Sequence, residues 1–271
     1  MYEDLYGLRK KPFSKTPNPA VFYRSSIHEE ALARLQFGAE ERELTLLTGE
    51  IGTGKTLLSR ALIDTLGEKF RPLLLINPRL TPNQFLRTLA LRMGIEHPAY
   101  HRTDLLEQVN EALYGAYEED VCPVVIIDEA QLIPSRATFE EIRLLTNFQL
   151  DDLNLVTLIL IGQPELRSRL KHQSYQAVRQ RIGLQYHLGP MGREDTGNYL
   201  SFRLEDAGGD PELFSEDAVD IVYRYSGGLP RMINNICANA LLLAFSRESD
   251  RIGPDIILDV VEDMGLEPAG G

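Results

Sequence analysis

Residues 49–56 read Gly-Glu-Ile-Gly-Thr-Gly-Lys-Thr and carry the spacing G-x-x-x-x-G-K-[ST], which is the pattern of a phosphate-binding loop. Glycines in such a turn allow backbone angles that point successive N–H groups at phosphate oxygens. Lys55 is placed to reach the β- and γ-phosphates of a nucleotide, and Thr56 to offer its hydroxyl to Mg²⁺. We expect the whole loop to bind nucleotide: Gly49, Glu50, Ile51, Gly52, Thr53, Gly54, Lys55 and Thr56.

The segments around this loop are those that the motif requires. An apolar run at 44–49 (LTLLTG) precedes it and reads as a strand, and a helix is predicted to begin near Lys55. The positive N-terminal end of that helix adds to the attraction for phosphate. A glycine-rich turn that matches by chance is the alternative, and the strand–loop–helix context weakens it.

Two carboxylates, Asp128 and Glu129, follow another apolar run in the stretch VVIIDEAQ. In P-loop enzymes a carboxylate at this position orders Mg²⁺ through its water shell, and a second one can polarise the attacking water as a base. We assign the first role to Asp128 and the second to Glu129. The alternative is a helix N-terminus that favours acids, with Asp128 as its cap. A pure nucleotide switch would not need Glu129, so the pair favours hydrolysis.

Polar residues also end other predicted elements. Gln163 follows the apolar run 155–162, so it is expected at the carboxyl edge of the sheet, where ligands of open α/β folds bind. There it can orient water or sense the γ-phosphate. The alternative is a glutamine that only begins a turn before Pro164. Asn147 is a weaker polar candidate and reads better as a helix-end residue.

Three arginines could neutralise a γ-phosphate. Arg179 and Arg181 suit a finger that reaches a neighbouring subunit's nucleotide. Pairing with surface carboxylates is the alternative, and spacing does not choose between the two arginines. Arg231 follows GGLP at the start of a predicted helix, where it could couple nucleotide state to the angle of a helical lid. The alternative is a simple helix-start charge.

These residues need a parallel sheet to hold them. Strands are predicted at 44–49, 71–77, 122–128 and 155–162, with a weaker one at 184–190. Their near-continuous Val, Ile and Leu content indicates burial on both faces. Beyond residue 191 only helices are predicted, with Ser215 and Pro254 as start signals and Gly208 and Gly227 as stops. The fold class is therefore α/β, a P-loop NTPase parallel sheet sandwiched by helices, with a small C-terminal helical lid domain. The expected divisions are an N-terminal arm and helix at 1–40, an ATPase domain at 41–190, a lid at 191–265 and a tail at 266–271.

Composition narrows the classes of protein. The chain has 271 residues, of which 43% are apolar and 25% charged, which is ordinary for a globular protein. No apolar run approaches the ~20 residues of a membrane span, and no secretory signal is visible, so we expect a soluble, cytoplasmic chain. Cys122 and Cys237 sit far apart among apolar neighbours and read as buried free thiols. The net charge of −12 argues against a non-specific polyanion binder, although the segment LRKKPFSK is locally basic.

Together these residues resemble the AAA+ ATPases, and most of all the secretion-pathway protein A branch (ExeA/GspA), which also holds the pilus-biogenesis ATPase MshM. The resemblance rests on the N-terminal box YGLRKKPFSKTPNPAVFYRSSIHEEALARL and on LLTGEIGTGKT, IIDEAQ, LLTNF, LIGQPEL, RQRI, YHL and GGLPR, in order along nearly the whole chain. The phosphate loop alone is generic, whereas the N-terminal box, GQPEL and GGLPR are specific.

The resemblance implies ATP bound with Mg²⁺ between an α/β domain and a lid, in a ring or other homo-oligomer. By similarity Asp128 and Glu129 are Walker B residues, Gln163 is sensor 1, Arg231 is sensor 2, and Arg179 or Arg181 is the trans-acting finger. The N-terminal box, including Phe13, Pro17 and His28, would flank the adenine. Family members commonly continue into a transmembrane segment and a periplasmic peptidoglycan-binding region, and this chain stops after the lid. It therefore reads as an excised module or a short homologue, at work in the cytoplasm or at the inner face of the inner membrane.

Three functions follow as hypotheses. The first is an ATPase that assembles or remodels an envelope machine, such as a type II secretion or type IV pilus-like system, with protein partners from that machine. The second is a DNA-transaction ATPase of the TniB/TnsC transposition-regulator type, which the acidic balance disfavours. The third is a non-hydrolysing nucleotide switch or scaffold, which Glu129 disfavours.

Overall fold

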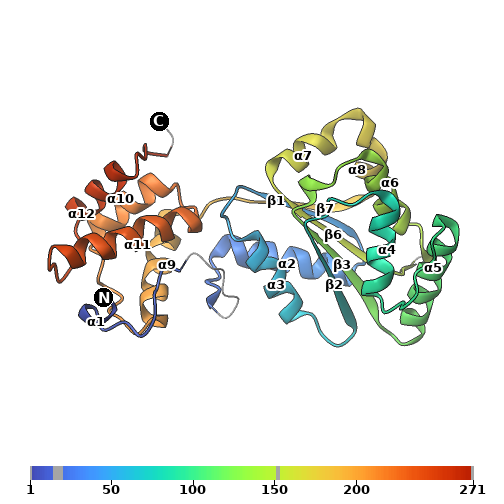
Figure 1. Ribbon diagram of the computed structural model, residues 1–271, viewed down its shortest axis with the longest axis horizontal. Helices are drawn as coiled ribbons and strands as arrows, with labels where there is room; N and C mark the ends of the chain where they lie inside the picture. Colours follow the sequence, from blue (N-terminus) through green and yellow to red (C-terminus); the bar gives the residue numbers. More distant parts are fainter. Residues whose placement is uncertain (1, 15–20, 151–152, 270–271) are drawn as a thin grey trace. The chain divides into compact units, whose positions relative to one another are not determined.

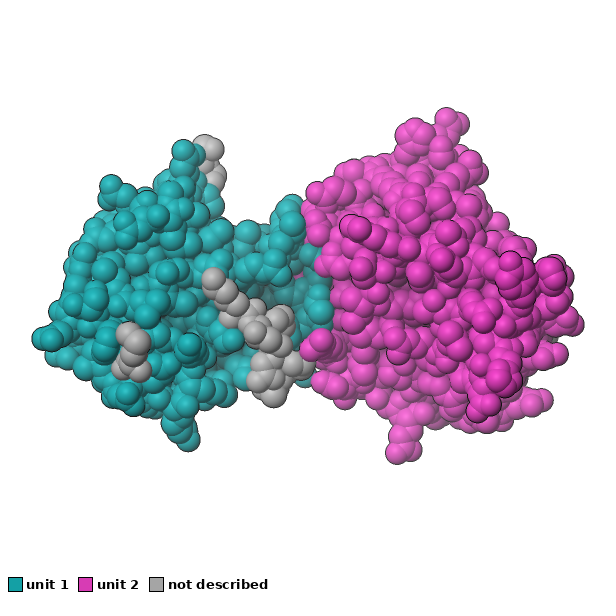
Figure 2. All heavy atoms as spheres, in the orientation of Figure 1, with its two compact units in different colours: residues 1–29, 50–57, 189–271 teal, residues 30–49, 58–188 magenta. Residues whose placement is uncertain are grey.

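The computed structural model describes residues 2–14, 21–150 and 153–269. They form two compact units, coloured separately in Figure 2. The first unit combines residues 1–29, 50–57 and 189–271, and the second combines residues 30–49 and 58–188. Residues 50–56 of the phosphate loop therefore belong to the same unit as residues 1–29 and the C-terminal helices.

The second unit is built on a five-stranded sheet with the order β2-β3-β6-β1-β7, and every neighbouring pair is parallel. Its strands are β1 (Leu44–Gly49), β2 (Phe70–Ile76), β3 (Cys122–Asp128), β6 (Thr157–Gly162) and β7 (Ile182–Leu188). All five predicted strands are confirmed. A two-stranded antiparallel hairpin that the sequence did not predict, β4 (Gln149–Leu150) and β5 (Leu153–Asn154), precedes β6.

Helices cover both faces of this sheet, as Figure 1 shows. On one face lie α2 (Ser26–Glu40) and α3 (Lys55–Thr65). On the other lie α4 (Pro82–Arg92), α5 (Arg102–Glu118) and α6 (Arg136–Leu145), followed along the chain by α7 (Pro164–Lys171) and α8 (Gln176–Arg181). The strands β1, β3 and β6 are buried along their whole length because helices exclude water from both of their faces.

The core on the α4–α6 side shows how alternation along the strands builds the unit. Leu46, Val125 and Leu158 come from three different strands and share one buried cluster with Phe85 of α4 and Phe139 of α6. Side chains at alternate strand positions point to the same face, so uninterrupted apolar strands supply both cores at once. Pro72 lies in β2, which is an edge strand of the sheet, where a missing N–H donor is tolerated.

The helical part of the first unit has its own core. It contains α1 (Tyr2–Leu5), α9 (Arg193–Asp206), α10 (Glu216–Ser226), α11 (Pro230–Ser246) and α12 (Pro254–Asp263). The predicted start and stop signals are confirmed, because Ser215 accepts the N–H of Ala218 as the N-cap of α10 and Gly227 ends that helix with a φ of 57°. The predicted fold class is thus confirmed.

Two further expectations concern single residues and segments. Cys122 and Cys237 are both free and buried, as predicted, and burial raises the pKa of the Cys237 thiol well above its ordinary value, so it is inert as a nucleophile. No helix among the described residues is long and apolar enough to cross a membrane.

Candidate functional site

The acidic turn at the end of β3 has an unusual backbone. Asp128 is 1% exposed, and Glu129 adopts a left-handed conformation with φ 56° and ψ 38°. The Glu129 N–H donates to Asp128 Oδ1 at 2.9 Å, and a single 3₁₀ turn, η2 (Ala130–Leu132), follows. A non-glycine residue in this conformation costs on the order of 1–3 kcal/mol, and such residues cluster at functional sites. The chain turns back on itself here.

The turn brings two predicted site residues into contact. Gln163 Nε2 donates to Glu129 Oε2 at 3.3 Å. Their strands β3 and β6 are neighbours in the sheet, and β6 also pairs with β1, which ends at Gly49. Parallel strands end at a common edge, so the acidic turn, Gln163 and the last residue of β1 share the carboxyl edge of this sheet.

A third residue at this edge was not predicted. Gln131 Nε2 donates to Glu129 Oε2, and Gln131 Oε1 accepts the backbone N–H of Gln163 at 3.1 Å. The side chain of Gln131 thus contacts both residues to which the sequence assigned a role. The only signal for it in the sequence was an amide two positions after Glu129 in DEAQ.

The phosphate loop is held by its own carbonyl group. Glu50 O accepts hydrogen bonds from Lys55 Nζ at 2.7 Å and from Thr53 Oγ1 at 2.9 Å. Gly52 and Gly54 have φ values of 87° and 98°, which side-chain-bearing residues rarely adopt. As predicted, a helix begins at Lys55. Glycine-dependent angles beside a helix N-terminus fit a nucleotide's phosphates.

The residues also fit magnesium in the form that accompanies a nucleotide. Among the described residues no group of three or more His, Cys, Asp or Glu could hold a metal ion by itself. Mg²⁺ usually keeps several waters and takes one or two carboxylates together with substrate phosphates. The hydroxyl of Thr56 and the carboxylate of the buried Asp128 are oxygen ligands of the kind that such an ion takes.

His28 is buried against the phosphate loop. Its side chain is 2% exposed; Nε2 lies 2.8 Å from Thr53 O and Nδ1 lies 2.6 Å from Ser25 Oγ. Burial lowers the pKa of His28, and the bond to the Thr53 carbonyl opposes that shift. Both ring nitrogens of His28 thus have protein partners, and one of these partners is a backbone carbonyl group of the phosphate loop. We infer that His28 stabilises the conformation of the loop.

Other residues of the N-terminal box lie in the helical part of the same unit. The Phe13 ring is 3% exposed and packs edge to face on Phe214, with 5.8 Å between ring centroids. Pro17, which the resemblance also placed near the adenine, lies outside the described residues. Tyr23 and Ser26 both donate to Asp195 of α9, at 3.3 and 3.0 Å. The arm therefore bonds to both the phosphate loop and α9.

Arg231 meets the phosphate loop directly. Its backbone N–H donates to Gly52 O at 3.3 Å in the first turn of α11. A Cβ atom built on Gly52 would lie 2.7 Å from Arg231 Cβ. The Arg231 side chain is exposed. The sequence placed Arg231 at the start of a helix, and the structure adds that this helix start touches the loop.

The two candidate finger arginines differ in their surroundings. Arg179 is half-buried and donates to the carbonyl groups of Leu170 and Lys171 at the end of α7, at 3.4 and 2.7 Å. Arg181 is exposed and donates to Asn147 Oδ1 at 3.0 Å. Neither arginine forms an ion pair with a carboxylate among the described residues. Asn147 follows the end of α6, as predicted for a helix-end residue.

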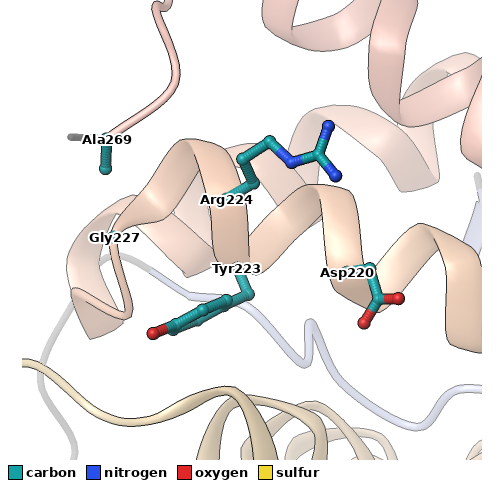
Figure 3. A pocket seen from close by; sticks show the side chains of 5 residues that line it. All are labelled: Asp220, Tyr223, Arg224, Gly227 and Ala269. Atoms are coloured by element: carbon teal, nitrogen blue, oxygen red, sulfur yellow. The ribbon is translucent and has the colours of Figure 1, made fainter. Parts of the chain in front are cut away.

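One cavity of about 340 Å³ lies on α10, and its lining includes none of the predicted site residues. Asp220, Tyr223, Arg224, Gly227 and Ala269 line it, and Figure 3 shows these side chains around the helix. The Ala269 N–H donates to Arg224 O at 2.8 Å, so the C-terminal segment forms one wall.

Comparison with known proteins finds relatives of the chain. Residues 39–170 match the AAA domain family. The general secretion pathway protein A of Aeromonas hydrophila is 38% identical over 274 aligned positions, which cover 100% of this chain and 50% of that protein. The chain thus spans about half the length of this curated relative.

Solved structures with the same fold include two origin-recognition proteins. The Aeropyrum pernix ORC2 protein aligns with a TM-score of 0.66 and 18% identity, covering 94% of this chain and 71% of that one. A chain of the Drosophila ORC bound to DNA aligns with a TM-score of 0.70 and 18% identity, covering 97% and 66%. Similarity at this identity shows the fold alone. The chain therefore contains an AAA domain, and over its whole length it is similar to about half of the general secretion pathway protein A.

Proposed function

We propose that this chain binds ATP with Mg²⁺ and hydrolyses it. The observation that carries the proposal is the contact of Glu129 with Gln163 at the sheet edge where β1 ends at the phosphate loop. A carboxylate held by two amide donors keeps a fixed orientation, which a general base needs in order to meet the attacking water. A non-hydrolysing switch needs no general base, so it would not require a second polar residue such as Gln163 to orient Glu129.

The roles follow from chemistry and position. The loop backbone and Lys55 would bind the β- and γ-phosphates. Thr56 and Asp128 would hold Mg²⁺, which when bound would supply positive charge beside the phosphates. Glu129 accepts a proton from the attacking water, and Gln163 orients that water. Arg231 reports the nucleotide state to the C-terminal helices. We propose residues 41–190 as the ATPase domain and residues 191–265 as the lid.

We also propose an oligomer in which Arg181 reaches the neighbouring subunit's γ-phosphate. Arg181 is exposed, whereas Arg179 is half-buried and bonded to the end of α7. An arginine that already satisfies helix-end carbonyls has fewer donors left for a phosphate. Mixing Arg181→Ala subunits with Lys55→Ala subunits, each inactive alone, should restore part of the ATPase activity. If Arg179→Ala mixtures recover activity and Arg181→Ala mixtures do not, the assignment of the finger is wrong.

The cellular role proposed is the assembly or remodelling of an envelope machine of the secretion or pilus kind. It rests on the similarity to the general secretion pathway protein A of Aeromonas hydrophila, which is 38% identical. Partners would be proteins of that machine, and the site of action the cytoplasm or the inner face of the inner membrane. The alternative is a DNA-transaction ATPase, because the fold is shared with a DNA-bound ORC structure.

Charge favours the first role. Residues 191–271 contain six arginines and no lysine against sixteen aspartates and glutamates, so the helical part repels a phosphate backbone. DNA binding in the presence of ATP should accordingly be weak at 50 mM salt. Tight binding that falls steeply between 50 and 200 mM salt would overturn the envelope role and support the alternative.

The test of hydrolysis is a steady-state assay with Mg²⁺ and ATP. The chain should release phosphate, and Lys55→Ala should lose both nucleotide binding and turnover. If the purified chain binds ATP and releases no phosphate, alone or as an oligomer, the non-hydrolysing switch is the better account.

A further inference from the structure

We propose that Gln131 is a positioning residue that fixes the catalytic carboxylate of Glu129 to the end of β6, and that Gly162 exists to make room for it. This inference rests on the proposed ATP hydrolysis. Gln131 is partly exposed and lies in the 3₁₀ turn that follows Glu129. No comparison assigns it a role.

The backbone of the acidic turn explains how Gln131 reaches its partners. Glu129 is left-handed, and the Leu132 N–H donates to Glu129 O at 2.8 Å, which closes the turn. This reversal brings the Gln131 side chain back towards the Glu129 carboxylate, to which it donates through Nε2.

The other end of the same amide binds a different strand. Gln131 Oε1 accepts the backbone N–H of Gln163 at 3.1 Å, at the N-cap of α7. That N–H belongs to a helix start that has no side-chain cap, and such donors need a partner. The Gln131 amide therefore joins the acidic turn to the end of β6. Because its oxygen accepts from Gln163 and its nitrogen donates to Glu129, these two bonds determine the orientation of the amide.

Gln163 completes a closed set of three bonds. Its side-chain Nε2 donates to the same Glu129 oxygen that Gln131 contacts, at 3.3 Å. The Glu129 Oε2 atom is thus held by two amides, and both of them bind this oxygen and not Oε1. Carboxylates that accept from two fixed donors lose rotational freedom. The second oxygen is left to act on water, with its direction set by Gln131 and Gln163.

Gly162 gives independent evidence that the Gln131 side chain occupies the space beside β6, where a larger residue would have its Cβ atom. A Cβ atom on Gly162 would lie 2.8 Å from Gln131 Oε1, closer than such atoms approach in folded proteins. The backbone of Gly162 has no positive φ, so conformation does not call for glycine here. The lack of space calls for it, because Leu166 Cδ2, like Gln131 Oε1, would lie 2.8 Å from the added Cβ atom. Leu166 is fully buried and its Cβ would lie 3.3 Å away, so it limits the space as well. Moving the Gln131 amide would in addition break its hydrogen bonds.

The experiment measures kcat and KM for ATP in single and double variants of the full chain. Gln131→Met keeps the size of the side chain and removes both hydrogen bonds, so kcat should fall about 10-fold to 100-fold. KM and nucleotide affinity should change less than about 2-fold, because Gln131 touches the acidic turn and β6, not the phosphate loop. Gln173→Met, an exposed glutamine in η3 (Gln173–Tyr175), is the matched control and should behave as the unaltered chain does.

Gly162→Ala gives the decisive second arm. It should lower kcat to a similar degree although Gln131 is still present, because the new methyl group displaces Oε1. In a Gln131→Ala background the same change should cost less further kcat, because the contact with Oε1 is gone and only the contact with Leu166 remains. Two single effects that do not add indicate a shared cause.

The outcomes separate the inference from the function on which it rests. If the unaltered chain shows no ATP turnover, the proposed hydrolysis fails. If it turns over ATP and Gln131→Met retains kcat within about 2-fold, the positioning role of Gln131 is refuted while hydrolysis stands. Equal losses of nucleotide affinity and kcat in Gln131→Met would also refute it, because they indicate general damage to the fold. Full additivity of Gly162→Ala and Gln131→Ala would refute the reserved space.

Discussion

Substituting Gly52 with alanine tests the contact between the phosphate loop and α11. Gly52 has a φ of 87°, and its missing Cβ would lie 2.7 Å from Arg231 Cβ. The Gly52 carbonyl also accepts the Arg231 N–H at 3.3 Å. One methyl group therefore strains the backbone of the loop and pushes on the first turn of the helix that approaches it.

The two costs can be estimated separately. A non-glycine residue with this backbone angle costs about 1–3 kcal/mol. A methyl group forced into packed space costs another ~1–3 kcal/mol, because carbon atoms prefer to lie about 3.5–4.0 Å apart. We expect a loss of about 3 kcal/mol in the free energy of the native loop conformation. If only a small fraction of molecules keeps that conformation, the apparent Kd for nucleotide rises by up to about 100-fold.

Denaturant unfolding and titration with a fluorescent ATP analogue measure the two effects. Gly115→Ala is the control, because Gly115 lies within α5, has open space around its Cβ position and should gain about 0.5–1 kcal/mol. In a double-mutant cycle, Arg231→Gly should relieve part of the Gly52→Ala cost, whereas Arg231→Ala, which keeps Cβ, should not. Unchanged nucleotide affinity and unchanged unfolding in Gly52→Ala would refute the contact.

Two stability predictions follow. Burial lowers the pKa of His28 below its ordinary value of 6.5, so the unfolded chain binds more protons than the folded one, and the free energy of unfolding should fall as the pH drops below about 6.5. His28→Gln should reduce the dependence of the free energy of unfolding on pH, whereas His97→Gln, at an exposed position, should not. The same pH dependence in both variants and the unaltered chain would contradict the prediction. Arg102 donates to Glu141, whose side chain is 9% exposed, at 2.8 Å, so Arg102→Ala leaves a nearly buried carboxylate without its partner. The substitution should lower the free energy of unfolding by about 1–2 kcal/mol in denaturant unfolding, more than Glu141→Gln does. A larger loss in Glu141→Gln would contradict the prediction.

The strands show what sequence patterns determine. The runs 44–49 and 122–128 match β1 and β3 to the residue, because short runs rich in Leu, Val, Ile and Thr that end in glycine or an acidic residue are typical of buried strands. The edge strand β7 is offset by two residues from its predicted range 184–190. Its alternating exposure gives a weaker hydrophobic signal, and its bounds are harder to place.

The sequence did not predict contacts between side chains that are far apart along the chain. Phe13 packs on Phe214, and no local pattern links the arm to that helix region. The bridge made by Gln131 depends on the register of β3 against β6 and on the left-handed turn at Glu129, and neither is encoded in a short motif. His28 was expected from the family resemblance alone, and its bond to Thr53 O became visible only in three dimensions.

The most direct test of the central claim is the ATP turnover of Glu129→Gln, measured beside its nucleotide affinity. The substitution preserves the size of the side chain and removes the charge that a general base requires. Affinity for ATP should stay within about 2-fold of the unaltered chain, and kcat should fall by at least about 100-fold. Turnover that survives the substitution would contradict the assignment of Glu129 as the catalytic base and, with it, the proposed site.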